Sequence, residues 1–232
     1  MTDDPQTAPQ TPAAALPGLE RRYLLPRDDE AAAALLGGVA RWQVPGSLTI
    51  TQVAKTLNQG EGLLYWANKM GLEGKTLDDA RNPGRTGGTR AHTAFTAWAD
   101  EPQPEGCGGI LRWHAETQAQ LIATERWVAT TEDPLVHGKG DYIRQAVDAQ
   151  GAPAVIVGDA KPLGAGKTYF EQHVQVAGYA YVLSTWGVRV AGTEILLYDD
   201  GDYHIVAGIV GSTLFHSLAR LAHTVHRLKA QL

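Results

Sequence analysis

The most constraining feature of this 232-residue sequence is a continuous apolar run, Ala154–Val157, followed directly by Gly-Asp-Ala-Lys. A strand with apolar side chains on both faces is typical of the inside of a sheet that further layers cover on each side. Asp159 and Lys161 end this strand two residues apart, and alternation along a strand points both side chains to the same side. The sequence therefore predicts a covered sheet with an acid and a lysine at the end of a central strand.

The regions around this run predict the other elements. Strand-like segments at 120–131, 135–148 and 153–161 are followed by a helix at 168–186 and by a hairpin over Gly201. A final helix, 212–232, carries an apolar stripe of Leu214, Leu218, Leu221, Val225 and Leu228. This order predicts an α/β fold with a mixed central β-sheet flanked by helices.

The N-terminal part is predicted to be helical. Residues 1–18 are acidic and rich in Pro, Ala and Thr, which predicts a disordered tail. Residues 19–110 form a helical N-terminal part, and from residue 47 onward this part is expected to make one compact domain with the core at 111–232. The predicted helices lie near 29–36, from about Thr51, over 61–74, and over 89–100 with Thr89 as the N-cap.

Composition excludes several classes of protein. A single cysteine, Cys107, excludes a disulfide framework, a cysteine-ligated zinc site and a four-cysteine iron–sulfur cluster. The net charge of −5 argues against a highly basic coat protein, but not against an enzyme that confines its positive charge to one groove. No apolar run approaches the roughly 18 residues of a membrane helix, and the N-terminus lacks a secretion signal. We therefore expect a cytoplasmic protein, of a bacterial or phage-infected cell, without a membrane partner.

A second acid lies upstream of the apolar strand. The segment "HGKGD" sets Asp141 on the preceding strand, beside two glycines that permit close backbone approach. If the two strands are antiparallel neighbours, Asp141 and Asp159 meet at one end. Two adjacent carboxylates repel unless a cation lies between them, and hard oxygen ligands favour Mg²⁺ or Mn²⁺. Lys161 would then orient or deprotonate a water there, a combination that suits phosphodiester hydrolysis.

The segment "GAGKT" allows a different interpretation. A phosphate-binding loop needs G-x-x-x-x-G-K-[ST], and aligning Gly166-Lys167-Thr168 places Lys161 where the first glycine belongs. We therefore favour a strand-to-helix loop in which Thr168 is the helix N-cap. A nucleotide-binding protein remains an alternative hypothesis.

Together, "GKGD" and "VIVGDAK" resemble the PD-(D/E)XK nuclease superfamily, in which a G-x-x-D strand precedes a strand ending in (D/E)-x-K. Three further segments resemble its RecB-like and phage-type exonuclease branch: "GGTRAH", "TERWV" and "QVAGY". Even "LTITQVAKTLN" resembles the helical N-terminal part of the phage-type members. The resemblance covers roughly residues 47–210 and implies a restriction-endonuclease-like core.

The resemblance also implies roles for individual residues. His92, Asp141 and Asp159 would hold the metal with the Ala160 carbonyl, and Glu125 would be a ligand or hold a metal-bound water. Lys161 would be the catalytic lysine, together with Asp159, Asp141 and Glu125 in the catalytic set. Contacts with DNA are expected from Gln175 and Tyr179, from a basic rim that includes Arg85 and Arg90, and from Lys167.

The expected function is a DNA nuclease that uses Mg²⁺ or Mn²⁺, with two ions and no iron–sulfur cluster. An exonuclease is favoured over an endonuclease, acting on free ends or single strands in replication, recombination or repair. Since no helicase region is visible, a helicase or recombinase supplied in trans is a compatible partner. The alternatives are a catalytically inactive nucleic-acid-binding protein of the same fold and an RNA nuclease.

Overall fold

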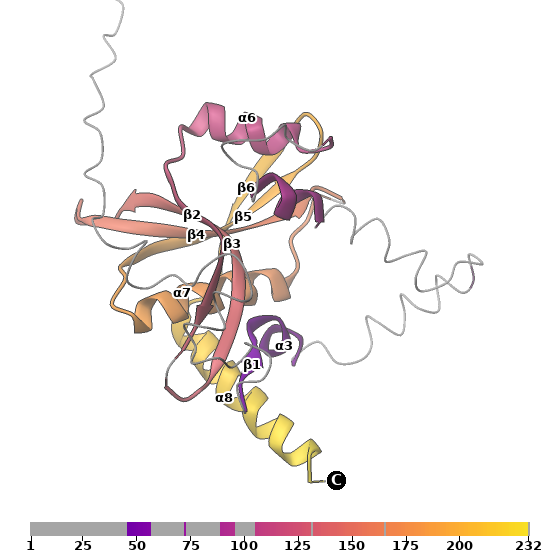
Figure 1. The fold of residues 1–232 in the computed structure, drawn as a ribbon, viewed down its shortest axis with the longest axis vertical. Coiled ribbons are helices and arrows are strands. Elements are labelled where there is room, and N and C mark those ends of the chain that lie inside the picture. The colour runs from indigo at the N-terminus through magenta and orange to yellow at the C-terminus, as the bar shows by residue number, and fades with distance from the viewer. Residues whose placement is uncertain are drawn as a thin grey trace, which may run out of the picture.

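The computed structural model describes residues 46–56, 72, 89–95, 105–130, 132–164 and 166–231. Within these ranges a central sheet is flanked by helices, and residues 89–95 are helical as expected (Figure 1). The labelled elements are β1 (Leu48–Thr49), α3 (Ile50–Lys55), α6 (Gly108–Thr117), β2 (Leu121–Ala129), β3 (Val136–Val147), β4 (Pro153–Pro162), α7 (Phe170–Thr185), β5 (Val190–Tyr198), β6 (Tyr203–Ala207) and α8 (Ser212–Lys229). The tail predicted at 1–18 and the helices predicted at 29–36 and 61–74 lie outside the described residues, apart from residue 72, which is helical.

The sheet is mixed, as predicted. Its strand order is β1-β3-β4-β5-β6, and β2 pairs with β3. Strand β3 is antiparallel to both β2 and β4, whereas β4 and β5 are parallel and are connected through α7. Strands β5 and β6 form the antiparallel hairpin expected over Gly201. The predicted α/β class and the β-β-β-α-β-β-α order are thus confirmed.

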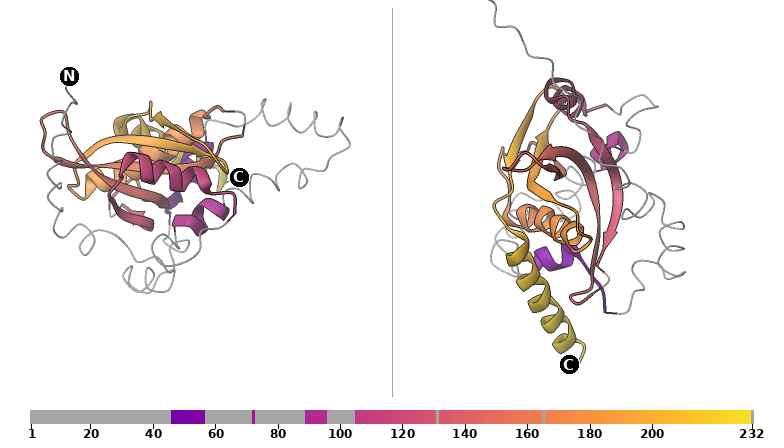
Figure 2. Two further views of the ribbon diagram at one scale, coloured as in Figure 1. Left: turned by 90° about the horizontal axis from the view of Figure 1, so that it is seen from above. Right: turned by 90° about the vertical axis from the view of Figure 1, so that its left-hand side faces the viewer.

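Both faces of the sheet are covered. On β5, Ile195 packs with Val176 of α7, whereas its neighbour Leu196 belongs to a second core cluster with Trp113 of α6. Helices α3 and α8 join α7 on the first face, and the strands curve around α7 (Figure 2). The alternation of side chains along β5 therefore supplies both core layers.

Helix α3 begins one residue before the predicted position. Its N-cap is Thr49, whose hydroxyl accepts a hydrogen bond from the Gln52 amide over 2.9 Å. The Gln52 side chain in turn accepts a hydrogen bond from the Thr49 amide over 2.7 Å, which completes a capping box. This cap turns the chain directly from β1 into α3 and fixes the position of Ile50 on α7.

The apolar stripe predicted on the last helix is correct at Leu218, which is buried, and wrong at three other leucines. Leu214, Leu221 and Leu228 are 47%, 48% and 57% exposed. The buried face of α8 combines Leu218 with three residues outside the predicted stripe, Phe215, Ala219 and Ala222. Phe215 packs against Gly178 of α7, so this side of α8 faces the core and Leu214, Leu221 and Leu228 face outward.

Two further observations concern the chain as a whole. No helix in the described ranges is both long and apolar enough to span a membrane. The boundary expected between residues 110 and 111 falls inside α6. Helix α3 shares a core cluster with α7 and α8, which places at least this N-terminal element on the same core as residues 111–232.

Candidate metal centre

The two acids predicted to converge do so on adjacent strands. Tyr142 of β3 pairs with Gly158 of β4 in antiparallel register, so Asp141 and Asp159 follow at the next step of the ladder. Both residues are buried, with 2% and 0% of their surface exposed. The Ala160 amide donates a hydrogen bond to Asp141 Oδ2 over 2.7 Å, which ties the first carboxylate to the strand that carries the second.

Glu125 reaches the same place from β2. Its neighbours Thr124 and Arg126 pair with Tyr142 and Gly140, so Glu125 lies opposite Asp141. Its φ is +52°, a left-handed conformation that is unusual for a residue with a side chain. Sequence reasoning predicted the acid at this position, but it did not predict this conformation.

The backbone conformation of Glu125 coincides with a reversal of the faces of β2. Ala123 and Val128 are five residues apart, and regular alternation would point them to opposite sides of the sheet. Both nevertheless belong to the core cluster around α7. Strained conformations of this kind cluster at functional sites, where the surrounding structure holds them in place.

His92 completes the group from the helical segment 89–95. Its Nδ1 lies 2.8 Å from Glu125 Oε1 and 3.4 Å from Asp141 Oδ1. Ligand atoms of His92, Glu125 and Asp141 all lie within 4.8 Å of one another, which is the spacing of a site that can hold a metal ion. The structure therefore brings together three of the four side chains predicted as metal ligands.

The fourth predicted ligand, Asp159, lies beside this group in different surroundings. Its Oδ2 is 2.5 Å from Lys161 Nζ, and Gln175 Nε2 donates a hydrogen bond to Oδ1 over 3.3 Å. Gln175 Nε2 also donates to the Tyr179 hydroxyl over 2.8 Å. The residues predicted to brace the site or bind DNA, Gln175 and Tyr179, thus form a chain of contacts that ends on Asp159.

Two carboxylate oxygens of the centre lack a directed hydrogen bond. Among the described residues, no donor with normal hydrogen-bond geometry reaches Glu125 Oε2 or Asp159 Oδ2, although both atoms are buried. Lys139 Nζ lies 2.9 Å from the first atom and Lys161 Nζ lies close to the second, so both contacts are ion pairs. Lys139 was not predicted as part of the site, although its place two residues before Asp141 on β3 could have indicated it.

Burial and neighbouring charges shift the pKa values of these groups. Burial, with the nearby Asp159 carboxylate, raises the pKa of Asp141 to about 7. The hydrogen bond with Glu125 raises the pKa of His92, partly offset by burial. Burial alone would lower the pKa of Lys161, but the carboxylates of Asp159 and Asp141 outweigh it and raise that pKa. The centre is therefore a buried set of acids whose mutual repulsion favours the uptake of a cation or a proton.

The remaining residues predicted to contact DNA are not gathered at the centre in the described part of the structure. Arg85 lies outside the described residues. Arg90 is exposed and lies against Gly106, where its Nη1 would be 2.5 Å from an added Cβ. Lys167 is exposed on the loop between β4 and α7, and the metal contact expected of the Ala160 carbonyl stays a prediction.

The "GAGKT" loop connects β4 to α7, as predicted. Gly164 and Gly166 have φ values of +47° and +68°. The predicted N-cap is wrong by one residue: Tyr169 precedes the first turn, and its amide donates to the Gln172 side chain over 2.8 Å. The Thr168 hydroxyl instead lies 2.9 Å from His173 Nε2. The loop therefore serves as a glycine-containing connection next to the helix that carries Gln175.

Comparison with protein-family models finds no match, and comparison with curated proteins also finds none.

Proposed function

We propose that this protein is a metal-dependent nuclease that hydrolyses phosphodiester bonds in DNA, built on a restriction-endonuclease-like core. The observation that carries the proposal is the convergence of Glu125, Asp141 and Asp159, all buried, on three adjacent strands beside Lys161. Burying several carboxylates is unfavourable unless cations or protons compensate them. A structural salt bridge would need only one acid and one lysine.

The residues present fit a hard divalent cation. His92, Glu125 and Asp141 would hold it, with Asp159 beside them, and oxygen-rich ligands favour Mg²⁺ or Mn²⁺. Glu125 Oε2 and Asp159 Oδ2 each form an ion pair with a lysine, so the assignment rests on the ligand atoms of His92, Glu125 and Asp141 and on their spacing. When bound, such an ion supplies Lewis-acid stabilisation of a phosphoryl group and lowers the pKa of a water. Two ions, as the superfamily resemblance implies, remain part of the proposal.

Lys161 and Gln175 have different proposed roles: Lys161 would contact a phosphate of the substrate, and Gln175 would hold Asp159 in place. The Lys161 ammonium, held by Asp159, offers a positive charge for the anionic phosphate and for orienting the attacking water. Gln175 and Tyr179 support Asp159 from α7, so that its carboxylate keeps one orientation. We propose an exonuclease acting on free ends or single strands in replication, recombination or repair.

The test is hydrolysis of end-labelled linear single-stranded DNA, linear double-stranded DNA and a closed circle in Mg²⁺, Mn²⁺ or EDTA. We expect metal-dependent degradation of linear DNA, lost in Asp159→Ala and Lys161→Ala. Glu116→Ala, which removes an exposed carboxylate on α6, is the matched control and retains activity. Cleavage of the circle would overturn the exonuclease assignment.

Other results separate the alternative functions. Preferential cleavage of a matched RNA would favour an RNA nuclease. DNA binding without cleavage in either metal would favour an inactive binding protein. Nucleotide affinity that is lost in Lys167→Ala, but kept in Lys161→Ala, would favour the phosphate-loop interpretation.

A further inference from the structure

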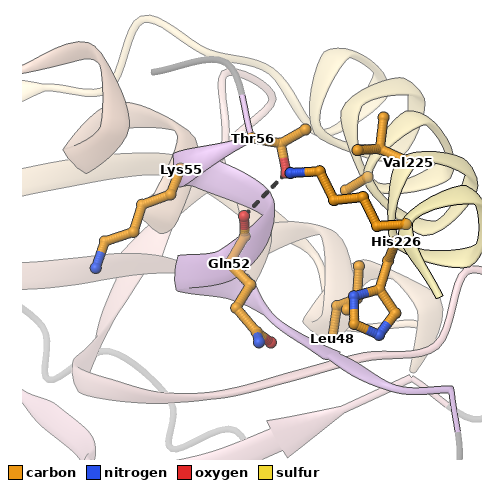
Figure 3. A pocket seen from close by; sticks show the side chains of 8 residues that line it. Leu48, Gln52, Lys55, Thr56, Val225 and His226 are labelled. Atoms are coloured by element: carbon orange, nitrogen blue, oxygen red, sulfur yellow. Dashed lines mark hydrogen bonds between the residues drawn. The ribbon is translucent and has the colours of Figure 1, made fainter. Parts of the chain in front are cut away.

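Two lysines contact the buried acids of the metal centre. Lys161 Nζ lies close to Asp159 Oδ2, and Lys139 Nζ lies 2.9 Å from Glu125 Oε2. Both lysine side chains are partly exposed, whereas both carboxylates are buried. Lys55, in contrast, lines a hollow between α3 and α8 and extends outward from α3 (Figure 3). The two lysines at the centre therefore differ in the acid that each of them compensates.

Lys139 pairs with a member of the metal-ligand group itself. The ligand atoms of His92, Glu125 and Asp141 lie within 4.8 Å of one another, whereas Asp159 lies beside them. A metal ion held by this group and the Lys139 ammonium therefore share the carboxylate of Glu125. Of the two lysines, Lys139 is the one whose charge acts on the ion through a common ligand.

The register between β2 and β3 holds Lys139 at this carboxylate. Lys139 pairs with Trp127, which lies two residues from Glu125, so Lys139 and Glu125 are diagonal neighbours across the two strands. Long side chains can span the distance between diagonal neighbours, about 7–8 Å. Glu125, whose φ is +52°, presents Oε2 to Lys139 and Oε1 to His92 Nδ1. A different side chain therefore engages each oxygen of this carboxylate.

The charge of Lys139 has opposite effects with and without a metal ion. Without an ion, the ammonium compensates a buried carboxylate that would be costly to leave unpaired. When an ion binds, the ammonium either stays and repels it or moves away and loses its ion pair with Glu125. Both possibilities weaken metal binding, so the same side chain stabilises the metal-free protein and opposes the ion.

We propose that Lys139 is a tethered cation that competes with the metal ion for Glu125. It holds the acids together when no ion is bound, and it lowers the affinity of the centre for the ion. This inference rests on the metal centre of the nuclease proposed above and adds the control of its metal affinity. A purely structural ion pair has a different consequence, because its loss would disturb Glu125 and weaken both folding and metal binding. The signs of the two effects therefore distinguish the roles.

The test compares the wild type with Lys139→Gln in two measurements on the full chain. Calorimetric titration with Mn²⁺ alone, without DNA, gives the Kd of the ion, and thermal unfolding in EDTA gives the stability of the metal-free protein. We expect Lys139→Gln to bind Mn²⁺ about tenfold more tightly, because a nearby positive charge is removed. In EDTA its melting temperature should fall by about 2–6 °C, because a buried carboxylate loses its partner. Lys139→Met, which also removes the charge but keeps an apolar stem, should show the same two changes.

Two further variants serve as controls for the titration. Lys139→Arg keeps the charge and should bind Mn²⁺ like the wild type. Arg189→Gln removes a cation that pairs with Asp148 over 2.8 Å, just beyond the end of β3, and should also leave the Mn²⁺ affinity unchanged. Unchanged or weaker Mn²⁺ binding in Lys139→Gln would overturn the inference, as would equally tight binding in either control.

The same measurements separate this inference from the proposed nuclease. If Mn²⁺ does not bind the wild type at all, both the metal centre and the competition by Lys139 are wrong. If Mn²⁺ binds and Lys139→Gln shifts affinity and stability in opposite directions, but the wild type hydrolyses no DNA in Mn²⁺, the nuclease proposal fails and the role of Lys139 stands.

Discussion

Glu125 combines a buried carboxylate with a left-handed backbone in the middle of β2. An L-residue in this conformation is less stable than glycine by about 1–2 kcal/mol. Glu125→Gly and Glu125→Ala remove the same functional group, but only alanine retains the unfavourable φ. We expect the glycine variant to be more stable than the alanine variant by about 1 kcal/mol, measured by urea unfolding. Equal stabilities would show that β2 relaxes to an ordinary strand once the carboxylate is removed.

Asp141 makes the stability of the metal-free protein depend on pH. Its folded pKa, about 7, lies above the ordinary value of 3.8, so the folded state binds the proton more tightly than the unfolded state. The stabilisation from this proton is complete below pH 3.8 and is lost as the pH rises to about 7. Asp141→Asn keeps the acceptor for the Ala160 amide without the charge. In EDTA, its free energy of unfolding relative to wild type should therefore increase from about pH 4 to about pH 7, and a constant difference would contradict this prediction.

The identities of the acids at the centre could be predicted from the sequence, but their surroundings could not. Asp159 and Lys161 follow an apolar strand, and Asp141 follows two glycines, so local pattern and resemblance sufficed for these residues. The ion pair of Lys139 with Glu125 depends on the register between β2 and β3. The positive φ of Glu125 has no signal in the sequence, since glycine or asparagine is the usual residue there.

Helix α7 depends on a glycine at its contact with α3 and α8. A Cβ at Gly178 would lie 2.6 Å from both Ile50 Cγ2 and a ring carbon of Phe215. Neither atom is the end of a flexible side chain, so the helices must separate. We expect Gly178→Ala to destabilise the protein by about 1–3 kcal/mol, even though alanine favours a helix. In chemical denaturation, Gly201→Ala is the control because its added Cβ meets nothing within 4 Å; equal stability of the two variants would contradict tight packing here.

The orientation of α8 shows what the periodicity of an isolated helix leaves open. Of the predicted stripe, Leu218 is buried beside Phe215 and Ala219, whereas Leu214, Leu221 and Leu228 are exposed. Which face of α8 is buried depends on the shape of the surface of α7 against which it packs. At Gly178 that surface accommodates the ring of Phe215, and the neighbouring residues of α8 are small alanines. The spacing of apolar residues along one helix carries no information about this complementarity with its neighbours.

At the scale of the whole molecule, the order of elements was predictable because each strand and helix carries a strong local pattern. The antiparallel pairing of β2, β3 and β4 follows from short turns, and the parallel β4–β5 pair follows from the intervening helix. The contact between α3 and α8 was not foreseen, because the two helices lie far apart in the chain. Only the packing of both helices on α7 brings them together.

Metal binding should act on the stability of the whole molecule. An ion that binds only the folded state stabilises it by RT ln(1 + [L]/Kd), about 2.7 kcal/mol when the ion is at about 100 times its Kd. We therefore expect the melting temperature of the wild type to rise by several degrees in Mn²⁺ or Mg²⁺ relative to EDTA. His92→Ala and Asp141→Asn should lose most of this rise because each removes one member of the ligand group.

The control for this measurement is Glu116→Gln, in which an exposed carboxylate outside the centre is neutralised. This variant should keep the full metal-dependent rise in melting temperature. A smaller rise would indicate that the ion binds non-specifically to surface carboxylates. Asp159→Asn tests the difference between the two parts of the centre. Because Asp159 lies beside Lys161 rather than within the group of His92, Glu125 and Asp141, its variant should retain part of the rise. A complete loss in Asp159→Asn, equal to that in Asp141→Asn, would place Asp159 among the direct ligands.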